Sequence, residues 1–333
     1  MSARAGLRVA TAVICCATLT VGACASPPDD AQKRALDALA VRDPGSVAPH
    51  TPPTKADFNG PAGHCPPFRS LAPSAARPAP GRMPRGTYMH TIQRNGQLNV
   101  GVDQNTRGLG YFNSIRSEPR MEGFEIDLVR EIARAIFGDP DKIRYTAIST
   151  QQRPSVVQHG DVDLVASSFS IDCDRRKSMR FSSVYYRAQM RLLVPKRPKV
   201  TGLRDLRGRY VCVTNKSTTI RRLTELQRRT AIKIYVVPLR SDCLVKLQQG
   251  TVQAIASDDA ILLGLNKQDP QTKIVGPGLQ CESWGIAINK KHPEFVRFVN
   301  AVLARLDRSG YTQRRRDHWL KGLTPPKTRA PCS

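Results

Sequence analysis

Apolar and polar residues alternate regularly along the chain from residue 91 onward. Short apolar runs such as 98–102 predict buried strands, and apolar residues that recur every three to four positions predict amphipathic helices. Phe124, Leu128 and Ile132, for example, give one apolar face to a helix over 123–138. Strands that alternate with helices imply parallel sheets covered by helices on both faces.

The same pattern divides the folded part of the chain into two successive α/β blocks. In the first block we expect strand 98–102, helix 123–138, strand 144–148, helix 153–158, strand 162–166 and strand 191–194. In the second block we expect strand 210–213, helix 219–229, strand 232–237, helix 242–248, strand 254–256 and helix 259–265. A strand at 284–288 and helices at 293–309 and 311–320 follow. Two blocks with extra helices indicate fold class α/β with two lobes, the first of which the returning chain completes.

The first 23 residues have the features of a secretory signal peptide. Arg4 and Arg8 precede an apolar run over 9–21, which is too short for a permanent transmembrane helix because a span needs ~20 residues. The run ends in Val-Gly-Ala-Cys at 21–24, which resembles the lipobox of bacterial lipoproteins. In that class Cys24 would carry the lipid and become the new N-terminus. A plain signal peptide cut elsewhere is the alternative.

Residues 24–90 are rich in proline, since 13 of the 25 prolines lie between 27 and 84. Proline-rich segments without apolar periodicity are extended. We therefore expect residues 24–90 to form a mobile stalk above the lipid anchor, and residues 326–333 to form a short tail.

Composition limits the classes of function that remain. An apolar content of 40% in 333 residues rules out a wholly disordered chain and a multi-span membrane protein. The net charge of +25 would suit nucleic acid, but the aromatic content is only 6% and export removes that partner. We therefore expect no nucleic-acid partner. The basic residues either contact anionic lipid heads or wall polymers, or they form a solvated surface.

Nine cysteines are present, and three of them lie in the predicted leader and anchor. The other six are Cys65, Cys173, Cys212, Cys243, Cys281 and Cys332. An even number in an exported chain indicates disulfides, and six cysteines allow fifteen pairings. None has the Cys-x-x-Cys spacing of a structural zinc site, so we expect no metal.

Several short motifs between 91 and 320 carry a resemblance to a known family. They are Val100-Gly-Val-Asp-Gln104, Gly108-Leu-Gly110, Gly123-Phe-Glu-Ile-Asp-Leu128, Gln152-Arg-Pro154, Val162-Asp-Leu164, Ser170-Ile-Asp-Cys-Asp-Arg175, Arg180-Phe-Ser-Ser-Val-Tyr-Tyr186, Ser217-Thr-Thr219, Asp258-Asp-Ala-Ile-Leu-Leu-Gly264 and Trp284-Gly-Ile-Ala287. In this order and spacing the chain resembles the extracellular solute-binding lipoproteins of family 3, the polar-amino-acid type, which work with ABC importers. Among these it is most similar to actinobacterial glutamate- and glutamine-binding lipoproteins.

The resemblance implies a periplasmic-binding-protein-like fold of type II, in which two α/β lobes joined by two strands close on a ligand. It places lobe 1 at 91–193 and 283–325, and lobe 2 at 194–282. It also implies a monomer on the extracytoplasmic face of the cell membrane, held by its lipid and needing no cofactor.

A free amino acid carries a carboxylate and an ammonium, so its site must offer both a cation and an anion. By resemblance, Arg175 grips the α-carboxylate with help from backbone N–H groups near Ser168 and Ser170; a surface arginine is the alternative. Ser217 and Thr218 stand before a helix, where hydroxyls and free N–H groups either bind anions or cap the helix.

The resemblance also assigns the amino group and the side chain of the ligand. Asp258 would receive the ammonium, although its neighbour Asp259 could equally be a helix cap. Asp103 matches a position that meets the ligand side chain and suits an amide or amino group. Arg153 matches an arginine that meets a side-chain carboxylate, unless it is only a helix-start arginine. An Asp103–Arg153 pair could neutralise itself and leave a site for both glutamate and glutamine types.

Two positions depart from the family pattern. Lys216 replaces the glycine of the usual Gly-Ser/Thr-Thr turn, so it is strained if that turn needs a positive φ. Alternatively, Lys216 adds positive charge to the cleft mouth. Asp172 stands where the pattern often has threonine or a small residue. Both departures make ligand choice harder to transfer from the family.

We expect a disulfide between Cys212 and Cys243, because the strand that holds Cys212 and the helix start that holds Cys243 can approach each other. The remaining pairs would be Cys173 with Cys281 near the hinge and Cys65 with Cys332 between stalk and tail.

These observations predict a protein that closes on a polar or acidic L-amino acid (glutamate, glutamine, aspartate or asparagine) and delivers it to an ABC importer. The same lobes could instead present the ligand to a membrane sensor. No motif such as Gly-x-Ser-x-Gly or His-Glu-x-x-His is present, so we expect no enzyme. The cyclohexadienyl dehydratases, which resemble this family, are the enzyme alternative.

Overall fold

The computed structural model describes residues 68–76, 78–197 and 199–323. The expectations for the signal peptide, Cys24, Cys65 and Cys332 lie outside these residues and stay predictions. The helices are α2 (Tyr88–Asn95), α3 (Phe124–Phe137), α4 (Arg153–His159), α5 (Cys173–Ser178), α6 (Thr218–Thr230), α7 (Arg240–Gln248), α8 (Asp259–Gln268), α9 (Pro293–Arg308) and α10 (Tyr311–Trp319). The strands are β1 (Leu98–Val102), β2 (Asn105–Thr106), β3 (Gly110–Asn113), β4 (Arg120–Glu122), β5 (Ile143–Ala147), β6 (Leu164–Ala166), β7 (Met179–Phe181), β8 (Tyr186–Pro195), β9 (Tyr210–Thr214), β10 (Lys233–Val237), β11 (Ala254–Asp258), β12 (Thr272–Trp284) and β13 (Ala287–Asn289).

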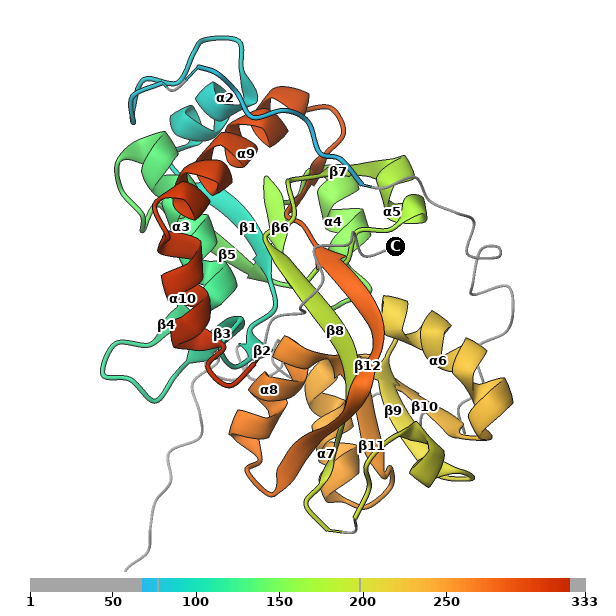
Figure 1. The fold of residues 1–333 in the computed structure, drawn as a ribbon. Coiled ribbons are helices and arrows are strands. Elements are labelled where there is room, and N and C mark those ends of the chain that lie inside the picture. Colours follow the sequence, from blue (N-terminus) through green and yellow to red (C-terminus); the bar gives the residue numbers. More distant parts are fainter. Residues whose placement is uncertain (1–67, 77, 198, 324–333) are drawn as a thin grey trace, which may run out of the picture. The chain divides into compact units, whose positions relative to one another are not determined.

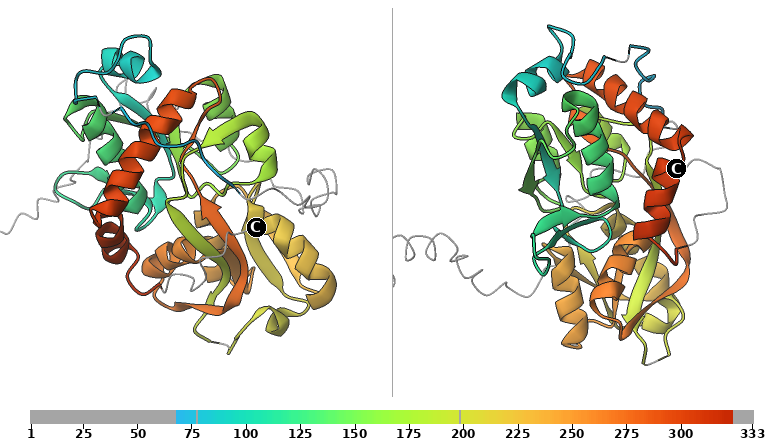
Figure 2. Two further views of the ribbon diagram at one scale, coloured as in Figure 1. Left: turned by 45° about the horizontal axis from the view of Figure 1, so that its top comes forward. Right: turned by 90° about the vertical axis from the view of Figure 1, so that its left-hand side faces the viewer.

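Lobe 1 is built on a five-stranded sheet in the order β5-β1-β6-β13-β7. Leu164 of β6 belongs to the core cluster that includes α3 and α9, whereas Val165 belongs to the cluster that includes α4. The two helix layers therefore cover opposite faces of the sheet (Figure 2). α3 buries the face that its periodicity predicted, and it ends at Gly138, whose φ of 82° is a left-handed conformation that glycine adopts at little cost.

Lobe 2 is built on a second five-stranded sheet in the order β10-β9-β11-β8-β12. Alternate residues of β9 face two separate core clusters: Val211 and Val213 pack with α6, and Cys212 packs with α7. β10, β9 and β11 are parallel, but β8 runs antiparallel to both β11 and β12. In lobe 1, β13 likewise runs antiparallel to β6. Both sheets are therefore mixed rather than purely parallel, because each includes strands that arrive from the other lobe.

β8 and β12 connect the lobes. They pair antiparallel from Tyr186 opposite Trp284 to Pro195 opposite Thr272 (Figure 1). β8 follows the last strand of the first pass through lobe 1, and β12 leads directly into β13 of the lobe 1 sheet. The predicted architecture of two α/β lobes joined by two strands is confirmed.

The folded part of the chain begins before the predicted boundary at residue 91. α2 packs on lobe 1 with Ile92 fully buried. Upstream of it, the Asn300 side chain donates hydrogen bonds to Ser70 Oγ and to the Leu71 carbonyl at 2.8 and 2.7 Å. The predicted mobile stalk therefore does not extend to residue 90. The apolar residues through which the segment before residue 91 packs on lobe 1 are few and irregularly spaced, so no periodic pattern in the sequence revealed this packing.

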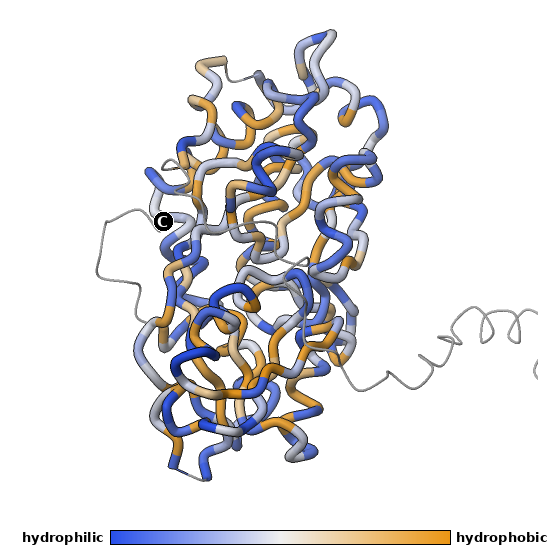
Figure 3. Tube along the Cα trace, turned by 90° about the vertical axis from the view of Figure 1, so that its right-hand side faces the viewer, coloured by the Kyte–Doolittle hydropathy of each residue, from blue (hydrophilic) through white to orange (hydrophobic). Residues whose placement is uncertain are grey.

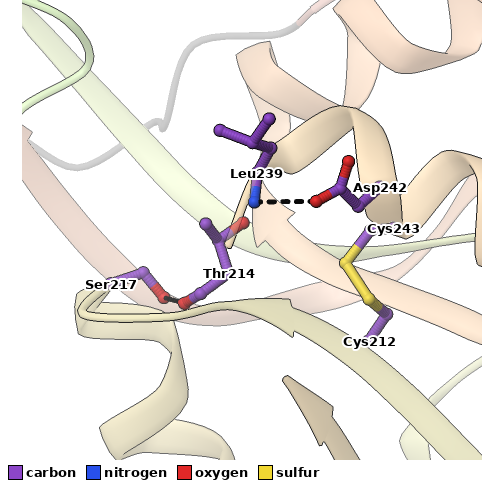
Figure 4. The surroundings of a disulfide bond; sticks show 6 residues. All are labelled: Cys212, Thr214, Ser217, Leu239, Asp242 and Cys243. Carbon is purple, nitrogen blue, oxygen red and sulfur yellow. Dashed lines mark hydrogen bonds between the residues drawn. A yellow bond between two sulfur atoms is a disulfide. The ribbon is translucent and has the colours of Figure 1, made fainter. Parts of the chain in front are cut away.

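Cys212 and Cys243 form a disulfide between β9 and the first turns of α7, as expected (Figure 4). The same turn is fixed by Asp242, whose carboxylate accepts a hydrogen bond from the Leu239 N–H at 3.1 Å. Cys173 and Cys281 are each disulfide-bonded as well. The pairing of these two with each other, like that of Cys65 with Cys332, stays a prediction.

Apolar residues gather inside each lobe and polar residues lie over the outer turns and helix faces (Figure 3). Within the part of the chain that the structure describes, no helix combines the length and apolarity needed to cross a membrane.

Candidate functional site

The carboxyl ends of strands from both lobes meet in one cleft. Ser168 and Ser170 follow β6 in lobe 1, whereas in lobe 2 Ser217 and Thr218 follow β9 and Asp258 ends β11. These five residues line a cavity of about 20 Å³ together with Thr150, Arg153, Arg175, Thr214, Thr219, Arg240, Ser257 and Ile261. The structure thus brings together every predicted site residue except Asp103, which reaches the cleft through a partner.

Arg175 lies on α5 and bridges the two sides of the cleft. Its guanidinium donates to the Ser170 carbonyl at 2.6 Å and to the Lys216 carbonyl of lobe 2 at 3.1 Å. Asp172 caps α5 by accepting the Arg175 backbone N–H, and its carboxylate also lies 3.4 Å from the guanidinium. The Arg175 side chain is only 13% exposed, so it is not a surface arginine. Burial lowers the pKa of Arg175, because a buried guanidinium loses its solvation by water.

Arg153 begins α4 and is buried, with 2% of the residue exposed. It donates to three backbone carbonyls, of Thr150, Ser167 and Ser168, at 2.8 to 3.2 Å. The suggested Asp103–Arg153 pair is not formed: the carbonyls hold Nε and Nη1 of Arg153, and Asp103 pairs with Arg240 instead. Burial, with the nearby Arg240 and Arg175 cations, lowers the pKa of Arg153.

Phe169 lies between two of these cations. The guanidinium carbons of Arg153 and Arg175 stand 4.5 and 4.7 Å from the centre of its ring. The face of an aromatic ring carries negative electrostatic potential, so it attracts both cations and fixes their separation.

Arg240, the first residue of α7, is the true partner of Asp103. Its guanidinium donates to Asp103 Oδ2 at 2.8 Å, and to Thr106 Oγ1 and the Ser167 carbonyl at 3.4 Å each. Asp103 Oδ1 accepts the Asn105 N–H at 2.7 Å, which holds the carboxylate toward the cleft. This ion pair crosses from lobe 2 to lobe 1, and its side chains are 8% and 14% exposed.

Asp258 faces the cleft with one oxygen committed and one without a partner. The Trp284 indole N–H donates to Oδ2 at 2.8 Å, and Oδ1 is buried and makes no hydrogen bond. Its neighbour Asp259 instead accepts the Ala260 N–H. Burial and then the Asp259 charge raise the pKa of Asp258 to about 6. Such a carboxylate suits an incoming cation with N–H donors.

Glu282, on the connecting strand β12, is a second buried carboxyl beside Asp258. Burial and then the Asp258 charge raise the pKa of Glu282 to about 7, against the lowering effect of hydrogen bonds to Ser170 and Thr218. The Thr218 Oγ1 atom lies 3.3 Å from Ser170 Oγ across the cleft. Residues of lobe 1, lobe 2 and the hinge therefore meet at this point.

Glu125 of α3 is a buried acid that is linked to the cleft through Ser168. One oxygen accepts the Ser168 N–H and the Tyr185 hydroxyl, while the other is buried without a partner. Ser168 has a φ of 48°, a strained value for a residue with a side chain. Its N–H is committed to Glu125, so it does not serve a ligand here as the resemblance suggested.

The turn before α6 carries the strain that the sequence indicated. Lys216 has a φ of 55°, the left-handed region where the family pattern has glycine. Ser217 donates its hydroxyl to the Thr214 carbonyl at 2.7 Å (Figure 4) and does not cap α6. The first N–H groups of α6 therefore lack a side-chain cap at the edge of the cleft.

A cavity of about 20 Å³ holds roughly one water molecule. An amino acid is several times larger, so it can enter only if the two faces of the cleft move apart. A larger cavity of about 1270 Å³ lies beside the start of β8 and α10, and its described lining includes Tyr185, Arg187, Thr312, Arg316 and Leu323. We place the site in the smaller cavity, because the buried charged groups converge there.

Sequence reasoning missed three charged residues of this cleft. Glu125 and Glu282 lie within or beside motifs quoted for the family resemblance, Gly123-Phe-Glu and Trp284-Gly-Ile, so their position was a usable signal. Arg240 had no local signal, because it reaches Asp103 across 137 positions of sequence.

The model of the bacterial extracellular solute-binding proteins, family 3, matches residues 98–322 of the chain. The glutamine-binding protein GlnH of an ABC transporter of Bacillus subtilis is 28% identical over 231 residues, which are 69% of this chain and 83% of that protein. The glutamate-binding protein GluB of Corynebacterium glutamicum is 28% identical over 66% of this chain and 77% of its own length.

Solved structures share the same fold. An ancestral arginine-binding protein, determined with arginine and also with glutamine, superposes with a TM-score of 0.61 in both forms. It is 26% identical over 67% of this chain, and the match covers 98% of the arginine-bound and 97% of the glutamine-bound chain. A cysteine-binding protein from Campylobacter jejuni reaches a TM-score of 0.63 at 20% identity, over 73% of this chain and 96% of its own.

Proposed function

The chain belongs to the bacterial extracellular solute-binding proteins of family 3, and on this premise we propose that it binds a polar or acidic L-amino acid in the cleft. Glutamate, glutamine, aspartate and asparagine are the candidates. The relatives above are named for glutamine and glutamate, which supports this class.

One observation carries the proposal. Arg175 and Asp258, of opposite charge and from different lobes, line the same small cavity, and both are buried. Arg175 is held mainly by carbonyls, and Asp258 keeps one oxygen without a partner. A zwitterion would satisfy both at once, with its α-carboxylate on Arg175 and its ammonium on Asp258.

Closure follows from the hinge. The ligand enters when lobe 2 moves away on β8 and β12, and the lobes then close around it. Delivery to an ABC importer is the output that the family supports, with the protein held on the extracytoplasmic side by a lipid on Cys24 and acting as a monomer. Presentation of the ligand to a membrane sensor is the alternative output, and an uptake assay in cells lacking the protein separates the two.

A thermal-shift panel of the twenty amino acids tests the function, because a ligand that binds only the folded state raises its melting point. Calorimetry then compares the wild type with Arg175→Ala, and with Arg228→Ala on the exposed part of α6 as the matched control. We expect Arg175→Ala to lose at least ~2 kcal/mol of binding free energy, the scale for stranding a buried partner. Equal affinity in all three proteins would place the site elsewhere, and turnover of prephenate would favour an enzyme.

A further inference from the structure

Asp258 lines the cleft, and a second buried carboxyl group, that of Glu282, lies beside it and is hydrogen-bonded to the cavity-lining residues Ser170 and Thr218. Asp258 comes from the end of β11, and Glu282 comes from the connecting strand β12. They are 4% and 5% exposed, and neither has a lysine or arginine nitrogen within 4 Å among the residues that the structure describes. Two buried acids without a cation are unstable together unless something positive or a proton is shared between them.

We propose that Glu282 is a second carboxylate of the amino-group subsite and binds the ligand ammonium together with Asp258. This proposal rests on the proposed function and names a further residue of the same site.

The number of hydrogen-bond donors supports a second acceptor. An ammonium has three N–H donors. Asp258 offers only Oδ1, because Trp284 already occupies Oδ2. An ionised carboxylate has about four acceptor positions, and Glu282 uses three of them, for Gln280 at 2.9 Å and for Ser170 and Thr218, so one is left. Its hydroxyl partners, Ser170 and Thr218, are themselves cavity-lining residues from the two lobes. Glu282 is therefore placed where a group held by both lobes would sit.

The other acids of the cleft are committed elsewhere. Asp103 is paired with Arg240, and Asp259 accepts the Ala260 N–H. Glu125 keeps one free oxygen, but its other oxygen accepts from Ser168 and Tyr185, and the charges that act on it most are those of Arg240 and Asp103 rather than that of Asp258. Glu282 is therefore the acid of the cleft that lies beside Asp258 and still has an acceptor position left.

The place of Glu282 in the chain links this contact to closure. Glu282 pairs with Ala188 of β8, so it lies on the two strands about which the lobes would move. An ammonium bound there would draw together the hinge, the hydroxyl of Ser170 and the hydroxyl of Thr218. Binding energy at the amino group would thus favour the closed arrangement directly.

Binding should also release a proton. The charged groups facing Glu282 are Asp258 and Arg175, and Asp258 additionally faces Asp259, Arg240 and Arg153. In the free protein, burial and mutual repulsion keep part of the pair protonated near neutral pH. The ammonium favours the ionised form of both carboxyls, so affinity should fall as the pH falls below about 7.

Calorimetry on the full-length protein tests this at pH 8 and pH 5.5, with the amino acid that gives the largest thermal shift. Glu282→Gln keeps the shape and an acceptor but removes the charge, and Glu225→Gln makes the same change at an exposed site on α6. We expect wild type and Glu225→Gln to bind about tenfold more weakly at pH 5.5 than at pH 8. Glu282→Gln should bind about tenfold more weakly than wild type at pH 8 and lose most of the pH dependence.

Glu282→Asp provides a second variant that keeps the charge on a shorter side chain. It should retain the pH dependence with reduced affinity. If Glu282→Gln binds as tightly as wild type with the same pH profile, the proposal is overturned while amino-acid binding stands. A changed melting temperature with an unchanged affinity and pH profile gives Glu282 a structural role and overturns it too. If the wild type binds no amino acid, the proposed function fails and takes this proposal with it.

Discussion

Replacing Asp103 with asparagine should raise the preference of the cleft for glutamate over glutamine. The Asp103 carboxylate lies 2.8 Å from Arg240 and is the negative charge nearest to that cation. Asparagine keeps the Oδ1 atom that accepts the Asn105 N–H, so the turn after β1 should persist. The change therefore removes a charge with little change of shape, and Arg240 becomes free for a ligand carboxylate.

The size of the effect follows from the geometry of the pair. A ligand carboxylate that shares Arg240 with Asp103 would lie about 4 Å from it, where two unit charges repel by ~4 kcal/mol at an effective dielectric constant of 20 and by ~1 kcal/mol in water. The two side chains are 8% and 14% exposed, which places the site between these limits. We take about 2 kcal/mol, which corresponds to roughly a 30-fold change in the ratio of the two affinities.

Calorimetric titration with glutamate and with glutamine measures that ratio in the wild type and in Asp103→Asn. Asp161→Asn, in the exposed turn after α4, is the control for loss of one acidic residue. Glutamine affinity should change little, because its amide carries no charge for Asp103 to repel. A ratio that stays within about threefold of the wild-type value would show that the ligand side chain does not reach Arg240.

Three further results are expected. Lys216→Gly should raise the free energy of unfolding in urea by about 0.5–1 kcal/mol, because glycine relieves a φ of 55° but adds entropy to the unfolded chain; a loss of stability would mean that the Lys216 side chain makes a needed contact. Replacing Cys212 and Cys243 together by serine should lower that free energy by about 3–4 kcal/mol, the value for a loop closed over 31 residues; an unchanged urea midpoint would contradict it. The ligand-free protein should lose stability as the pH rises from about 4.5 to about 7, because the folded state holds the Glu282 proton more tightly than the unfolded chain does, and the melting temperature of Glu282→Gln should vary less over that range.

The predicted elements were found where local periodicity is strong and were missed where tertiary contacts decide. The α3 helix from Phe124 to Phe137 follows from one apolar face and a terminal glycine, both readable from adjacent residues. α2 and the short strands β2 to β4 were missed, because each is brief and stabilised by packing on lobe 1. The 13 residues of β12 were missed as well, since polar positions and Gly276 and Gly278 interrupt their alternation.

The candidate site divides in the same way. Positions that follow strands, such as Asp258, could be located from sequence, because strand ends determine which side of a sheet a residue occupies. The pairings between charged residues of the site could not be predicted from the sequence. Asp103 pairs with Arg240, whereas backbone carbonyls of Thr150, Ser167 and Ser168 hold Nε and Nη1 of Arg153. Nothing in the spacing of charged residues reveals these partners.

In the proposed function, the distribution of charge in the cleft would provide the driving force for closure. Arg153 has no carboxylate within 4 Å among the described residues, and Asp258 and Glu282 have no cation at that distance. Each buried charge without an opposite partner costs free energy. An amino acid would supply the ammonium that the two acids lack and a carboxylate for the cleft arginines, but it contacts residues of both lobes only when the lobes are together. The ligand would therefore bind the closed form more tightly than the open form, and a hinged receptor needs that difference in affinity in order to report that its site is filled.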